Sequence, residues 1–188
     1  MSGALARRRA VPWAVGAALA LGSGGCGGRP ASAPGPAAST SDAPRVEFSF
    51  PTPDGGAFTS AAARGRATAV VFVTTYDAAS QVLAQRIADL ARRMRPRINA
   101  CAVVLEAPRY APLVQVFGET LRLGYPVALA DEATRRGDGP FGRVDRVPVV
   151  VVLDRAGRER WRHAGLVSTR RLERALANAA EQGLGSRP

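Results

Sequence analysis

The chain has 188 residues, of which 46% are apolar, so it can hold one domain with a substantial core together with terminal extensions. Its formal net charge is +11, and all 26 basic residues are arginine. These arginines are scattered and aromatic residues make up only 6%, which is not the clustered basic face of a nucleic-acid-binding protein. One histidine and two cysteines are too few for a metal site of several such ligands, so we expect no nucleic acid, metal or other cofactor.

The N-terminus reads as a targeting signal. Three arginines at 7–9 precede an apolar stretch over 10–21, which is shorter than the roughly 20 residues that a membrane-spanning helix needs. Small residues then lead to Cys26. This order predicts a signal peptide over 1–25. The segment resembles the signal of bacterial lipoproteins, which implies that Cys26 carries a lipid. A secreted or soluble periplasmic protein with an ordinary cleaved signal is the alternative.

The composition changes twice after Cys26. Residues 26–44 are rich in Gly, Pro, Ala and Ser and cannot bury much apolar surface, so we expect a disordered linker. The folded domain is predicted over 45–183, with a short tail at 184–188. A lipid anchor followed by a linker indicates a periplasm-facing protein of the bacterial cell envelope. Gly27 stands where some inner-membrane lipoproteins carry Asp, which favours the outer membrane.

The first half of the domain begins with strand patterns. Apolar and polar residues alternate over 46–50, a turn follows at 53–56, and 57–60 is expected to return as a short strand. The continuous apolar and β-branched run over 68–75 predicts a strand buried on both faces.

A helix is predicted next, over 79–95. Leu83, Ile87, Leu90 and Met94 form one apolar stripe on it, and Pro96 ends it. A second buried strand is predicted over 98–105.

The second half continues the alternation. Apolar positions over 110–121 predict a helix, 125–130 a short strand, and the polar stretch 134–143 a loop or short helix. The apolar run 147–153 and the stretch 159–163 read as antiparallel strands around a turn at 154–157. Ser168 is a suitable N-cap for a last helix that ends near Gly183. This order predicts an α/β fold with a mixed central sheet flanked by helices.

Three stretches carry a resemblance to a known family: 50–59, 70–76 and 142–158, the last with Val147–Pro148, an apolar run and an Asp-x-x-Gly turn. In these the chain resembles the thioredoxin-like superfamily, and specifically its TlpA/ResA-type envelope proteins. The resemblance implies a thioredoxin-like fold and a cis peptide bond between Val147 and Pro148. It also implies thiol–disulfide exchange by a Cys-x-x-Cys pair, with the loop at Pro148 presenting backbone groups to an extended partner.

The chain departs from the family at that pair. Asp77 and Ser80 stand at the two cysteine positions, and neither side chain can act as the thiolate nucleophile or resolve a mixed disulfide. Asp77 is better explained as the cap of the following helix, so we expect no catalytic residue at these two positions.

The other reactive side chains have structural explanations. Cys101 lies inside the second buried strand, where a small apolar role is favoured over a reactive thiol. His163 is expected to pack or lie at the surface near Trp161, because no nucleophile stands by it for activation.

Three functions remain open. The first is a membrane-anchored thioredoxin-fold protein that binds an envelope protein or peptide through Tyr76, Val147 and Pro148 without redox activity at the usual site. The second is a thiol–disulfide oxidoreductase that acts through Cys101 alone. The third is a structural subunit of the envelope.

Overall fold

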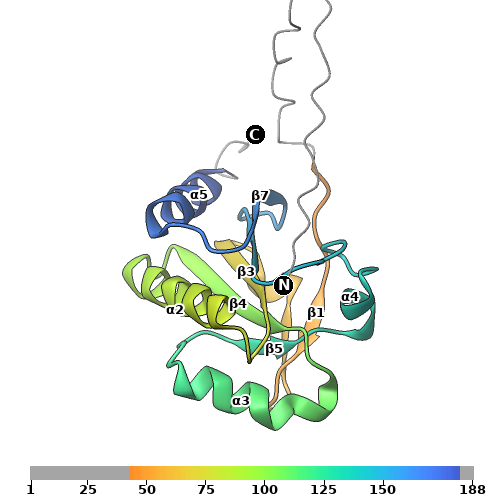
Figure 1. Cartoon of the computed structure of the whole chain (residues 1–188). Helices are drawn as coiled ribbons and strands as arrows, with labels where there is room; N and C mark the ends of the chain where they lie inside the picture. Colours follow the sequence, from red (N-terminus) through yellow and green to blue (C-terminus); the bar gives the residue numbers. More distant parts are fainter. Residues whose placement is uncertain (1–42, 183–188) are drawn as a thin grey trace, which may run out of the picture. The chain divides into compact units, whose positions relative to one another are not determined.

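The computed structural model describes residues 43–182 (Figure 1). The predicted signal peptide over 1–25, Cys26, most of the predicted linker and the tail at 184–188 lie outside the described residues. The strands are β1 (Ser49–Pro51), β2 (Ala57–Thr59), β3 (Ala67–Val73), β4 (Ile98–Val104), β5 (Val127–Leu129), β6 (Val149–Leu153) and β7 (Glu159–Ala164). The helices are α1 (Ser60–Ala63), α2 (Ala78–Arg93), α3 (Ala111–Thr120), α4 (Glu132–Arg136) and α5 (Thr169–Glu181), with a 3-10 turn η2 (Pro108–Tyr110) before α3.

A five-stranded sheet in the order β5-β4-β3-β6-β7 forms the centre of the domain. Strands β3, β4 and β5 are parallel, whereas β6 pairs antiparallel with both β3 and β7. Every residue of β3 and β6 is buried, as expected for strands that helices and loops cover on both faces. The predicted α/β fold with a mixed, helix-flanked sheet is confirmed.

The two faces of the sheet are covered differently. One face packs against α2 and α5 (Figure 1). Their inward side chains include Leu83, Ile87, Leu172 and Leu176. The predicted apolar stripe of α2 is therefore confirmed. The other face is covered by the β1–β2 hairpin and by the segment that contains Phe141.

Phenylalanine rings fill the core beneath the hairpin. Phe141 is 3% exposed, and its ring centroid lies 5.2 Å from those of both Phe48 and Phe72 and 6.1 Å from that of Phe50. Such spacings are typical of favourable aromatic pairs. Because Phe141 packs in the core, it holds in place the start of the loop that leads to Val147.

Short elements differ most from the sequence-based prediction. The strand predicted over 57–60 ends at Thr59, because the Thr59 hydroxyl accepts a hydrogen bond from the amide of Ala62 and starts α1. α4 begins at Glu132, before the stretch 134–143 that was predicted as a loop or short helix, because Asp131 caps it through the amide of Thr134. No helix between residues 43 and 182 is both long and apolar enough to cross a membrane.

Candidate functional site

Asp77 and Ser80 lie at the carboxyl end of β3, where α2 begins. Asp77 is the N-cap residue of α2, and its Oδ2 accepts hydrogen bonds from the backbone amide and the Oγ of Ser80, both at 2.7 Å. The Ser80 Oγ in turn accepts a bond from the amide of Thr74 at 3.3 Å, and Ser80 is fully buried. The prediction that Asp77 caps this helix is confirmed.

Electrostatics agree with a capping role. The pKa of Asp77 lies below its usual value, chiefly because the Ser80 hydroxyl donates to the carboxylate, and next because the Ser80 amide does so. The carboxylate is therefore the stable form at neutral pH, and its Oδ2 is already hydrogen-bonded. In this arrangement the hydrogen bonds of Asp77 and Ser80 cap the start of α2 and fix the turn that precedes it.

Tyr76 is the most exposed large apolar side chain of the described residues, at 81% of its surface. It lines two cavities of about 310 Å³ each. One is bounded by Gln81 and α3, including Leu113 and Val116, and none of its lining residues is charged. Leu113 and Val116 are about half exposed, so apolar surface continues from Tyr76 along α3.

The second cavity brings Tyr76 together with Val147, which is 71 positions later in the chain. The Val147–Pro148 peptide bond is cis, as the resemblance implied. The Pro148 carbonyl accepts a bond from the amide of Gly165 at 2.7 Å, whereas the amide and carbonyl of Val147 bond no other backbone group within residues 43–182. Tyr76 and the backbone of Val147 thus share one cavity, and Pro148 itself is buried next to Val147.

Glu106 and Thr74 line the same cavity, and sequence reasoning did not find them. Glu106 Oε1 accepts bonds from the amide and the hydroxyl of Thr75, each at 2.7 Å. Glu106 Oε2 and Thr74 Oγ1 are buried and have no partner among the described residues. One signal was available: both residues closely follow buried parallel strands, whose carboxyl ends meet at one edge of the sheet.

Cys101 lies in the middle of β4, fully buried among apolar side chains. Burial raises the pKa of its thiol, so the thiolate needed for disulfide exchange is strongly disfavoured in the folded domain. The prediction of a buried, packing cysteine is confirmed, whereas Cys26 lies outside the described residues. The His163 ring stacks on Trp161 with centroids 5.6 Å apart, as the sequence predicted for a packing role.

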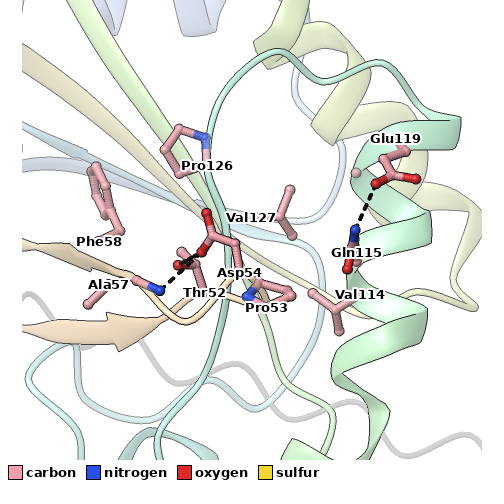
Figure 2. Close-up of a pocket in the computed structure, with 12 residues that line it drawn as sticks. Thr52, Pro53, Asp54, Ala57, Phe58, Val114, Gln115, Glu119, Pro126 and Val127 are labelled. Carbon is pink, nitrogen blue, oxygen red and sulfur yellow. Dashed lines mark hydrogen bonds between the residues drawn. The ribbon is translucent and has the colours of Figure 1, made fainter.

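A separate cavity of about 490 Å³ lies between the turn of the β1–β2 hairpin and α3 (Figure 2). On its hairpin side, Asp54 accepts bonds from the Thr52 hydroxyl and the Gly56 amide, which lower the pKa of Asp54. On the α3 side, Gln115 donates to Glu119 at 3.0 Å (Figure 2). None of the predicted site residues lines this cavity, and no cluster of three potential metal ligands occurs within residues 43–182.

No protein-family model and no curated protein matches the sequence. Solved structures do match. A thiol:disulfide interchange protein of the thioredoxin family from Chlorobium tepidum shares 26% identity, with a TM-score of 0.61 over 73% of this chain and 96% of that one. A DsbE-type thiol:disulfide interchange protein described as putative, from the same organism, shares 17% identity, with a TM-score of 0.62 over 73% of this chain and 96% of that one.

The exposed lipoprotein thioredoxin Etrx1 of Streptococcus pneumoniae shares 13% identity, with a TM-score of 0.58 over 70% of this chain and 98% of that one. The described domain therefore spans nearly the whole of each of these neighbours. The chain has the thioredoxin-like fold.

Proposed function

We propose that the protein binds a partner polypeptide of the bacterial envelope at the Tyr76 turn and the Val147–Pro148 loop, without thiol exchange at the usual site of the fold. A lipid on Cys26 anchors the protein in a membrane, with the outer membrane favoured over the inner one. The domain faces the periplasm. The single observation that carries the proposal is that the exposed Tyr76 ring shares a cavity with Val147, whose amide and carbonyl bond no other backbone group among the described residues.

Unpaired backbone next to a sheet suits an extended partner segment. Such a segment gains affinity from main-chain hydrogen bonds and specificity from pockets that hold its side chains. The Val147 amide and carbonyl supply the first kind of contact. The uncharged cavity beside Leu113 and Val116 supplies the second, because it accepts an apolar side chain without desolvating a charge.

The absence of thiol exchange at this site rests on the residues that occupy it. Asp77 and Ser80 hydrogen-bond each other and the start of α2, and neither side chain carries sulfur. Within the described domain the remaining thiol is that of Cys101, which is buried and has a raised pKa. An oxidoreductase that acts through Cys101 would need β4 to open before each turnover.

The envelope location is supported by the sequence of the N-terminus and by one neighbour that is itself an exposed lipoprotein. Metabolic labelling with a clickable fatty acid tests this part. We expect label on the full chain and none on the Cys26→Ser variant. Label that persists in Cys26→Ser would contradict lipidation at this residue.

Site-specific photocrosslinking tests the binding site. The photoreactive p-benzoylphenylalanine replaces Tyr76 in the full chain, and a matched variant carries it at Leu166, which is 49% exposed and lines neither Tyr76 cavity. We expect one dominant partner polypeptide to be captured in intact membranes from position 76 and not from 166. Val147→Pro, which removes the Val147 amide proton, should reduce this capture.

Two results would overturn the proposal. Equal capture from positions 76 and 166, unaffected by Val147→Pro, would favour a structural subunit whose partner contacts lie elsewhere. Reduction of insulin disulfides by the purified chain above the dithiothreitol background, abolished in Cys101→Ser, would show an enzyme that works through Cys101.

A further inference from the structure

A cavity of about 540 Å³ lies at the amino end of β3, whereas Tyr76 follows the carboxyl end of that strand. Three arginines from three separate segments line it: Arg66 just before β3, Arg97 just before β4, and Arg155 in the β6–β7 turn. The fold thus gathers at one place cations that are far apart in the sequence.

Neutral groups, rather than carboxylates, position two of these arginines. Arg155 Nε donates to the carbonyl of Gly65 at 3.0 Å, and Arg66 Nη1 donates to Asn99 Oδ1 at 3.3 Å. None of the ion pairs formed within residues 43–182 involves Arg66, Arg97 or Arg155. Their charges are therefore available to a ligand.

The charge balance of the cavity indicates what kind of ligand fits. Glu181 is the one carboxylate among the lining residues, so two positive charges are in excess. A phosphate monoester carries nearly two negative charges at neutral pH, and its oxygens match the planar donor fork of arginine.

The rest of the lining is apolar. Met94, Pro96, Ala177 and Ala180 form the wall beside the arginines. Such a wall can contact the carbon chain of an ester, but it offers nothing to a free inorganic ion. The cavity therefore suits a phosphate that carries a small apolar body.

The N-terminal segment joins the domain at the same turn that supplies Arg155. The Arg158 guanidinium donates to the carbonyl of Ala43 at 2.8 Å, and the amide of Val46 donates to the carbonyl of Gly157 at 2.9 Å. A membrane reached through that segment would be a source of phosphate esters on lipid headgroups, and a soluble ester is the other source.

We propose that this arginine cavity binds a phosphate monoester with a small apolar body, through the guanidinium groups of Arg66, Arg97 and Arg155. The site is independent of partner binding at Tyr76, since the two cavities share no residue.

The first experiment is a titration of the ¹⁵N-labelled full chain in neutral detergent with glycerol 3-phosphate, followed by amide chemical shifts. Arg97→Gln is the cleanest variant, because the Arg97 side chain makes no ion pair or hydrogen bond with another residue between 43 and 182. Arg174→Gln on the exposed face of α5 removes the same charge outside the cavity. We expect saturable shifts at Gly65 and Arg97 and a Kd raised about threefold to tenfold by Arg97→Gln but not by Arg174→Gln.

The second experiment distinguishes the two sources. Flotation of the Cys26→Ser chain, which lacks the proposed lipid, is measured with vesicles of phosphatidylcholine and phosphatidic acid, a lipid monoester. It is compared with flotation on vesicles in which phosphatidylglycerol supplies equal negative charge. If the protein prefers phosphatidic acid and Arg97→Gln removes this preference, the ligand is a lipid headgroup. If glycerol 3-phosphate binds saturably but the vesicles show no such preference, the ligand is a soluble ester. Amide shifts that do not saturate, or an equal loss of affinity in Arg97→Gln and Arg174→Gln, would show that binding follows net charge alone. Either result would overturn the proposal.

Discussion

Replacing Thr74 with valine is expected to stabilise the protein, although the change removes a polar group at the candidate site. Thr74 is 7% exposed, and its Oγ1 is buried without a partner among the described residues. Leaving a buried hydroxyl unpaired costs about 1–3 kcal/mol, and valine has nearly the same shape without that oxygen. Because the residue borders a cavity, we expect the lower end, an increase of about 1 kcal/mol in the free energy of unfolding.

Urea unfolding of the full chain measures this change, with a Tm rise of about 3–5 °C as the thermal counterpart for a domain of this size. The neighbouring residue supplies a matched control. Thr75→Val removes the 2.7 Å bond from Thr75 Oγ1 to Glu106 Oε1, so it should lower the free energy of unfolding by about 1–2 kcal/mol. If Thr74→Val instead destabilises the protein as much as Thr75→Val does, the Thr74 hydroxyl has a partner in solution and its assignment as unpaired is refuted.

Three further predictions concern the core and the turn. In the Cys26→Ser chain, Cys101 should react with Ellman's reagent only when the protein unfolds, because it is fully buried; prompt labelling of this native variant would contradict the placement. Phe141→Ala should lower the free energy of unfolding by about 3–5 kcal/mol in urea, and Phe141→Leu by clearly less, since leucine refills much of the space among the rings. Asp77→Ala should lower the Tm more than Asp77→Asn, which keeps an oxygen acceptor at the start of α2. Because folding lowers the pKa of Asp77, its carboxylate contributes to stability above the ordinary aspartate pKa of 3.8, and this contribution is lost as the pH falls from there through the lower pKa of the folded state. A difference in Tm between wild type and Asp77→Asn that is unchanged down to pH 2 would disprove this pH dependence.

The long elements could be predicted because their local patterns agree with their packing. The runs that became β3 and β6 are continuously apolar, and the stripes of α2 and α5 have helical spacing. The cap at Asp77 was also predictable, since a side-chain oxygen at the start of a helix finds its amide partner within three residues. Short elements such as α1 depend on a single cap and carry too few residues for a periodic pattern.

The candidate site could be predicted only in part. Tyr76, Asp77 and Ser80 are close in sequence, and the resemblance placed Val147 and Pro148 beside them. Glu106 and Thr74 went unnoticed, because an isolated Glu or Thr after a strand is ordinary in sequence. Their significance lies in two unpaired oxygens, which become visible only when the surrounding side chains are in place.

The sequence by itself determined the class of fold and the cap at Asp77, because apolar periodicity and residue identity are local properties of the chain. The tertiary structure alone decided which surfaces are available to bind a partner or a ligand. It exposed Tyr76 in one cavity with the backbone of Val147, which bonds no other backbone group within residues 43–182, and it drew Arg66, Arg97 and Arg155 around another cavity at the other end of β3. The physical reason is that burial, pairing and cavity shape depend on contacts between segments that are distant in the sequence, and no local pattern encodes those contacts.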